Sequence, residues 1–220
     1  MGVKGELCTD EVMAHIAAMP RLRKLMAQGT VATDAGFIAL SRSQTLEHLW
    51  GRECPNLTGR GFAALSHLPV LRGLAVSCKQ VDDVALAQLS HFPSLRELLP
   101  MDVSDAGFRH VGACVDLDHL CCMYCRDTTD EATRQLRRLT KLRRYYAGAT
   151  RITDVSLEIL STLRMLERVE IYECLEVTDA GVRQLATLPR LRELSLSGLP
   201  FVTRATAEAL PATIRVEYHA

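Results

Sequence analysis

The chain has 220 residues, with 26 basic and 26 acidic side chains and a formal net charge of zero. This length can bury a sizeable core in one or two domains. A neutral chain lacks the basic field that nucleic acid or an anionic membrane attracts, so neither is expected as a partner, and 48% hydrophobic content argues against disorder. The opening residues are too polar for a secretory signal and eight cysteines are sparse for a disulfide framework, which together predict a soluble, cytoplasmic protein.

One local pattern recurs along the whole chain. A short polar pair precedes a run of small residues, first at Thr9 and then near positions 33, 58, 82, 104, 129, 153, 178 and 203, at intervals of 22–25 residues. Threonine and serine are good helix N-caps, and an aspartate directly after the cap suits the positive end of the helix dipole. Each pair therefore predicts a helix, the first over roughly Asp10 to Met19.

A second pattern runs in phase with the first. The motif L-x-x-L-x-L follows each predicted helix and alternates as a strand does, starting at residues 22, 46, 71, 95, 117, 142, 166 and 191. Residues 214–218 alternate in the same way and predict a closing strand. Because one apolar helix face and one apolar strand face cannot be buried alone, the units must stack into a solenoid around a parallel sheet. The fourth unit is short and carries Pro100, which predicts a kink or register break near residues 100–103.

The unit resembles the cysteine-containing leucine-rich repeat, as found in the repeat domains of F-box/leucine-rich-repeat proteins. The closest copies run from Leu46 to Cys54 and from Leu166 to Cys174, and Cys125 takes the same ninth position in the fifth copy. The resemblance implies an α/β leucine-rich-repeat horseshoe of about nine repeats, with the sheet on the concave face and the helices on the convex face. It implies a single domain over residues 1–220. An F-box would need a helical segment ahead of the repeats, and only residues 1–8 precede the first cap, so the chain is expected to be a free-standing repeat protein or the recognition half of a longer parent.

Function is expected on the concave face. Positions three, five and seven of the strand motif point to that face, while positions one, four and six point into the core. An apolar stripe of Leu99, Cys121 and Tyr146 lies there, rimmed by charge, and Trp50 also points outward. Aromatic and arginine side chains are common interface anchors. The predicted contact residues are Trp50, Arg52, Leu99, Met101, His119, Met123, Arg144, Tyr146, Arg168 and Tyr172.

These residues predict a non-enzymatic scaffold that binds a protein or peptide. The alternative is the substrate-recognition portion of an F-box type ubiquitin-ligase adaptor. Coverage of the stripe by a second copy also stays open, so we expect a monomer or a weak homodimer.

Chemical activity has weaker support. His119, Cys121 and Met123 share a face and could bind copper or zinc, but Cys122 and Cys125 point inward and cannot join them, so no metal and no cofactor are predicted. A nucleophile pair of Cys121 and His119 lacks an oxyanion pocket, so no enzyme is predicted.

Two remaining features have structural interpretations. A basic run is expected to be a solvated helix face, with an acidic partner or RNA as the alternative; it comprises Arg134, Arg137, Arg138, Lys141, Arg143 and Arg144. Glycines follow several of the polar pairs and are expected to allow close packing of helix on strand; they are Gly36, Gly61, Gly107 and Gly181.

Overall fold

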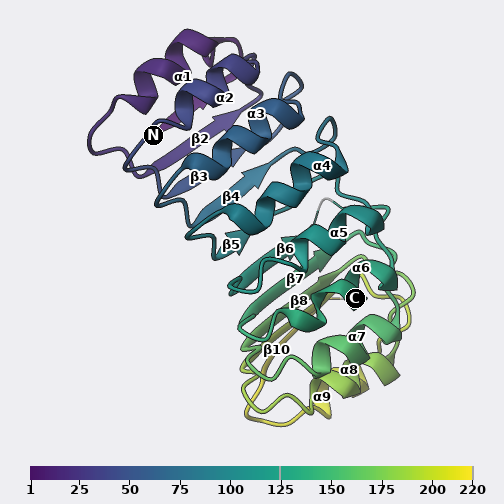
Figure 1. Ribbon diagram of the computed structural model, residues 1–220. Coiled ribbons are helices and arrows are strands. Elements are labelled where there is room, and N and C mark those ends of the chain that lie inside the picture. Colours follow the sequence, from purple (N-terminus) through teal and green to yellow (C-terminus); the bar gives the residue numbers. More distant parts are fainter. Residues whose placement is uncertain (124, 220) are drawn as a thin grey trace. The chain divides into compact units, whose positions relative to one another are not determined.

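The first of two compact units covers Met1–Asp102. The computed structural model describes residues 1–123 and 125–219, apart from the side chain of Lys4. Parallel strands alternate with helices in this unit, and the strands pair in chain order (Figure 1). The strands are β1 (Gly2–Lys4), β2 (Lys24–Gln28), β3 (His48–Gly51), β4 (Gly73–Val76) and β5 (Glu97–Leu98). The helices are α1 (Asp10–Ala17), α2 (Asp34–Leu40), α3 (Gly59–Ala64) and α4 (Asp83–Leu86), with 3-10 turns at Gly5–Leu7, Leu65–His67 and Ala87–His91.

The second unit covers Val103–Ala220 and has the same arrangement. Its strands also pair in parallel and in chain order. They are β6 (His119–Cys122), β7 (Arg144–Gly148), β8 (Arg168–Tyr172), β9 (Glu193–Ser197) and β10 (Arg215–His219). The helices are α5 (Asp105–Val111), α6 (Asp130–Gln135), α7 (Asp154–Ser161), α8 (Asp179–Leu185) and α9 (Arg204–Glu208), with a 3-10 turn at Leu136–Arg138.

The strand register keeps equivalent repeat positions side by side. Lys24 pairs with His48, which pairs with Gly73, and Arg144 pairs with Arg168, which pairs with Glu193. All of these are third positions of the strand motif. The fourth-position side chains lie beneath them in the core, as the buried Leu49 and Val169 illustrate. The predicted separation of inward and outward columns is therefore confirmed for these strands.

The first residue of each polar pair is the N-cap of an α-helix, and each except Ser104 accepts a side-chain hydrogen bond from a helix N–H. Each α-helix begins one residue after the cap, and the Thr33 hydroxyl, for example, accepts a hydrogen bond from the Ala35 N–H at 3.2 Å. Asp82 replaces the hydroxyl residue at the fourth helix and accepts from the Ala85 N–H at 2.8 Å. These side chains satisfy N–H groups that have no partner within the helix.

The aspartates that open the helices also link consecutive repeats. Asp154 accepts from the N–H and the hydroxyl of Thr178 in the next repeat, at 2.8 and 2.6 Å. The same two bonds join Asp10 to Thr33 and Asp130 to Thr153. This aspartate ladder continues through Asp34, Asp105 and Asp179. The ladder is interrupted in the third repeat, where Gly59 occupies the position of the aspartate.

The ladder corrects the interpretation of the glycines. A Cβ built on Gly181 would lie 2.3 Å from Oδ1 of Asp154, and one on Gly61 would lie 2.4 Å from Oδ1 of Asp34. The glycine thus makes room for the carboxylate of the preceding repeat's helix. Packing of helix on strand, the predicted reason, does not account for the nearest contacts at Gly36, Gly61 and Gly181.

Strand β5 is short near Pro100, but its register with β4 does not break. Strand β5 has two residues, and pairing returns afterwards only as a single bridge between Ser77 and Met101. Asp102 then takes a left-handed conformation with φ of 62°, as Glu53 does at the equivalent position of the second copy. The bridge keeps Met101 in register with Ser77 at the seventh position of the motif. Met101 is 5% exposed, so it offers little surface to a partner.

The two ends of the chain extend the strand pattern. The closing strand is present as β10, and the Tyr218 hydroxyl donates to the Val202 carbonyl at 2.9 Å. The Arg204 guanidinium covers the Tyr218 ring at 5.6 Å from its centroid. Strand β1 was not predicted, because three residues are too few to show an alternation.

Candidate functional site

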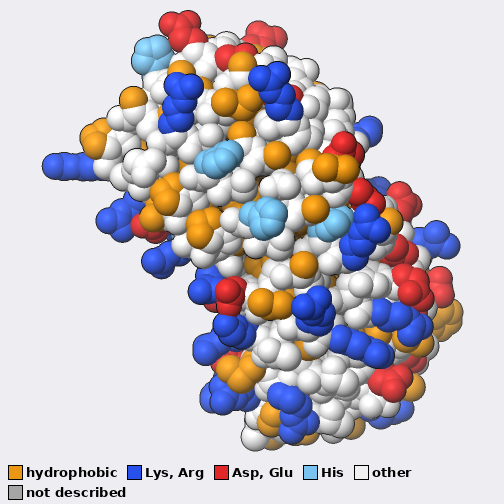
Figure 2. Space-filling model, in the orientation of Figure 1, with side chains coloured by type: hydrophobic (Ala, Val, Ile, Leu, Met, Phe, Trp, Pro, Cys, Tyr) orange, Lys and Arg blue, Asp and Glu red, His pale blue; other side chains and the backbone are white. Residues whose placement is uncertain are grey.

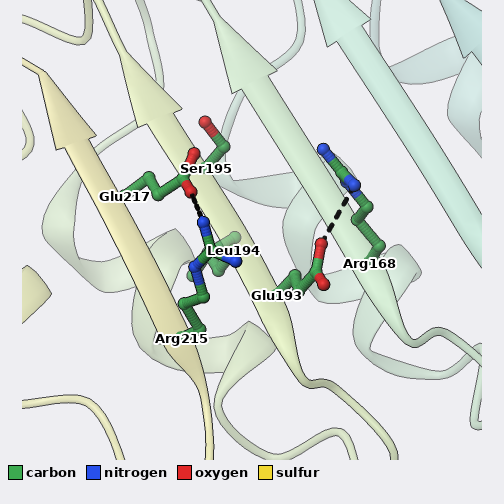
Figure 3. A pocket seen from close by; sticks show the side chains of 6 residues that line it. All are labelled: Arg168, Glu193, Leu194, Ser195, Arg215 and Glu217. Carbon is green, nitrogen blue, oxygen red and sulfur yellow. Dashed lines mark hydrogen bonds and ion pairs between the residues drawn. The ribbon is translucent and has the colours of Figure 1, made fainter.

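The open face of the second unit carries the third, fifth and seventh positions of strands β6 to β10. Figure 3 shows Arg168, Glu193, Arg215 and Glu217 on the side of the sheet that faces away from the helices. Tyr146 pairs in register with Cys121 on one side and with Glu170 on the other. The fifth-position column therefore changes from apolar to charged across this face.

Tyr146 makes two ring contacts on this face. The His119 ring meets it edge-on with 5.0 Å between centroids, and the Arg168 guanidinium lies 5.7 Å from its centroid. Burial lowers the pKa of His119 to about 4, and the Arg144 and Arg168 cations add to this effect. His119 is therefore neutral at physiological pH, and neither of its ring nitrogens has a hydrogen-bond partner within the described residues.

Met123 and Tyr172 are exposed apolar side chains of the same face. A Cβ on Gly148, which lies between them, would come within 3.3 Å of Met123 Cγ and 3.2 Å of Tyr172 Cδ1. Both side chains thus lean over a position without a side chain. Met123 is 37% exposed and Tyr172 41%, so each offers apolar surface to solvent. The Tyr172 hydroxyl donates to Glu173 at 2.6 Å, which fixes its orientation.

A network of ion pairs holds Arg168 on this face. Arg168 donates to Glu170 through Nε and Nη2, at 2.8 and 2.5 Å, and its Nη1 lies 3.0 Å from Glu193. Arg215 pairs with Glu217 on the last strand (Figure 3). Arg168 is thereby held against Tyr146 by two carboxylates. Four residues of this network were not among the predicted contacts, namely Glu170, Glu193, Arg215 and Glu217. Which of these side chains form ion pairs depends on how far each one extends towards the neighbouring strand, and a repeat pattern contains no information about that.

The open face of the first unit has a smaller aromatic pair. The His48 and Trp50 rings meet edge-on at 5.7 Å between centroids, and His48 Nε2 lies 3.9 Å from Glu97. Glycine at position 73 gives the His48 ring its room, because a Cβ there would lie 2.5 Å from His48 Cδ2. Trp50 Nε1 is buried and has no hydrogen-bond partner within the described residues.

The remaining predicted contacts divide between the units. Arg52 is exposed and Leu99 half-buried in the first unit, whereas Arg144 is half-buried in the second. The structure brings His119, Tyr146 and Arg168 into direct contact, with Met123 and Tyr172 bordering Gly148 nearby. We call these five residues, together with Cys121, the strand-face cluster.

The cysteines offer little reactive chemistry. All eight are buried and none is in a disulfide. Burial raises the pKa of Cys114 to about 12, and burial together with the neighbouring Cys8 does the same for Cys54. Among the described residues no group of three or more histidine, cysteine and acidic side chains is placed to hold a metal ion.

These thiols give a direct test of the fold. We expect the native chain at pH 7.5 to react with less than one equivalent of Ellman's reagent within minutes, because buried, protonated thiols are poor nucleophiles. All eight should react after unfolding in guanidinium chloride. Rapid reaction of two or more thiols in the native chain would contradict the burial described above.

A strand and a helix repeated every 22–25 residues, with parallel strands and leucines directed inward, define the leucine-rich-repeat fold. Cys54, Cys125 and Cys174 are buried at the ninth position, as the cysteine-containing pattern requires.

The fold resembles that of Rad7 in the yeast Rad7–Elc1 complex, with a TM-score of 0.64 and 14% identity over 98% of this chain and 73% of Rad7. It also resembles internalin C2 of Listeria monocytogenes, with a TM-score of 0.59 and 19% identity over 96% of this chain and 83% of that protein. No family model matches the sequence. No helix in the described part of the chain is long and apolar enough to cross a membrane.

Proposed function

We propose that this chain is a non-enzymatic scaffold that binds a protein or peptide partner on the open face of its strands. The observation that carries the proposal is the fixed position of Tyr146 between His119 and Arg168, beside the exposed Met123 and Tyr172. Tyrosine and arginine are the residue types that most often anchor protein interfaces. A face already ordered before binding loses less side-chain entropy when the partner arrives.

The surroundings of the cluster support this function. Arg168 is oriented by Glu170 and Glu193, so its stacking against Tyr146 does not depend on a partner. Apolar surface next to oriented charge is typical of an interface core with its polar rim. The eight buried, free thiols support a reducing compartment, and we propose the cytoplasm.

The test compares three proteins in affinity capture from the source organism. They are the native chain, a strand-face variant Tyr146→Ala/Tyr172→Ala, and a control variant Leu175→Ala/Phe201→Ala. The control removes two apolar side chains that are 60% and 63% exposed on loops outside the open face. Circular dichroism establishes that all three are folded.

We expect a partner that the native chain and the control retain and the strand-face variant loses. With the purified partner, the strand-face variant should bind at least about 30-fold more weakly, which corresponds to roughly 2 kcal/mol. Equal capture by both variants, or loss with the control alone, would place the binding surface elsewhere.

The substrate-recognition part of a ubiquitin-ligase adaptor is a second candidate. One observation favours it, namely the likeness to Rad7, which was solved in complex with Elc1. Identification of an F-box in the parent coding sequence would support this candidate. Capture of a partner by a chain whose gene encodes no F-box would favour the scaffold instead.

A further inference from the structure

Basic side chains gather at one end of the strands in the second unit. We call this end the strand-entry edge; it consists of the segments between each helix and the next strand, residues 112–118, 136–143, 162–167, 186–192 and 209–214. These segments hold seven lysines and arginines against three carboxylates, a net charge of +4 in a chain whose formal net charge is zero. In Figure 2 basic side chains line the left margin of the lower part of the view, where Figure 1 shows these strands beginning.

The guanidinium groups of five arginines of this edge have no hydrogen-bond or ion-pair partner within the described residues. They are Arg137, Arg138, Arg164, Arg190 and Arg192, and all are exposed. The other two cations do have partners, and both partners are carboxylates. Lys141 contacts Asp116, and Arg143 lies 3.5 Å from Glu167.

Compensation of the helix dipoles does not account for the whole charge. Five helices, α5 to α9, end towards this edge, and each C-terminus carries a partial charge of roughly −0.5. Their sum offsets at most about 2.5 positive charges, so a positive surplus remains. Aspartates of the ladder lie at the opposite ends of four of these helices, α5 to α8, which separates the two signs of charge along them.

The edge suits carboxylates better than other anionic groups. Nucleic-acid binding adds aromatic side chains on which bases stack, and the five segments of the edge contain no tyrosine, tryptophan or phenylalanine. A membrane surface would need an apolar helical face, and the one exposed large apolar side chain of these described segments is Val115. The planar guanidinium of arginine matches the geometry of a carboxylate, and on this edge Arg143 Nη1 lies 3.5 Å from Oε1 of Glu167.

We propose that the strand-entry edge of the second unit is a docking surface for an acidic protein segment. Its exposed arginines bind aspartate or glutamate side chains of that segment. This surface is separate from the strand-face cluster, and the proposal does not depend on the proposed function.

The test uses a fluorescein-labelled polyglutamate peptide of twelve residues as the probe, with fluorescence anisotropy at 50 mM salt. The entry variant is Arg164→Gln/Arg192→Gln. A matched control, Arg126→Gln/Arg151→Gln, removes two exposed arginines from the loops that follow strands β6 and β7, so both variants lose the same charge. The strand-face variant Tyr146→Ala/Tyr172→Ala is included as a third protein.

We expect saturable binding to the native chain that the entry variant weakens at least 10-fold and the control less than 2-fold. Binding should be unchanged by the strand-face variant, which separates this proposal from the proposed function. The proposal is overturned by absence of binding to the native chain, or by equal weakening in the entry and control variants. Tighter binding of a single-stranded DNA oligonucleotide or of anionic vesicles through the same arginines would overturn the choice of an acidic protein segment.

Discussion

Replacement of Gly181 by alanine is expected to destabilise the chain by about 2 kcal/mol. Gly181 lies in the first turn of α8, and an alanine Cβ would lie 2.3 Å from Oδ1 and 2.8 Å from Cγ of Asp154. Relief of this overlap requires a local shift of Asp154 or of the start of α8, as the accommodation of Ala132 beside Asp105 at the equivalent position of α6 illustrates, where both bonds to Thr129 are kept. Overpacking of this kind costs roughly 1–3 kcal/mol. Urea unfolding followed by circular dichroism measures the change.

The sign of the effect distinguishes the ladder from local helix preference. In a helix interior alanine is more favourable than glycine by up to about 1 kcal/mol, so propensity alone predicts stabilisation. Gly2→Ala in strand β1 is the control for loss of a glycine without overlap, because nothing lies within 4 Å of its Cβ position. Gly181→Ser should cost less than Gly181→Ala, since Ser156 at the equivalent position donates its hydroxyl to Asp130 at 2.5 Å. A Gly181→Ala chain as stable as the native one would show that Asp154 moves freely.

The repeat pattern predicts the architecture because the same helix-start and strand motifs occur in each repeat. The hydroxyl and the L-x-x-L-x-L motif recur in phase, so caps, strands and register follow from local chemistry, as at Thr33 and Leu49. The columns of the open face follow from the same register. This is why Tyr146 and Arg168 could be placed together before their contact was known.

Contacts between repeats were the part that the sequence did not reveal. Asp154 was interpreted through the dipole of its own helix, whereas its hydrogen-bond partner is Thr178, 24 residues away. An aspartate at a helix start can interact both with the dipole of its own helix and with the next repeat, so the repeat pattern cannot distinguish these two roles. The low exposure of Met101 was not predicted either, because it depends on neighbouring side chains that a repeat pattern does not describe.

Asp130→Asn is expected to lower the free energy of unfolding by about 2 kcal/mol at pH 7. The Asp130 carboxylate accepts from the N–H and hydroxyl of Thr153 at 2.9 and 2.8 Å, and from the hydroxyl and N–H of Ser156 at 2.5 and 3.2 Å. Hydrogen bonds to a charged group contribute roughly 1.5–3 kcal/mol each, and partial exposure of this carboxylate reduces their sum. The side-chain amide of asparagine would direct its own N–H groups at some of the hydroxyl and N–H groups that donate to Asp130.

The pH dependence of that loss identifies the charge as its source. Burial acts to raise the pKa of Asp130, but the hydrogen bonds from Ser156 and Thr153 outweigh it and hold the pKa below its ordinary value of 3.8. Because the folded-state pKa is the lower one, the stabilisation is complete well above pH 4 and is lost as the pH falls through the folded-state pKa. The difference between the native chain and Asp130→Asn should therefore shrink between pH 5 and about pH 3. Asp127→Asn, at an exposed aspartate of the same unit, should show no comparable loss at either pH. A difference that stays constant down to pH 3 would mean that packing of the side chain, and not its charge, joins these two repeats.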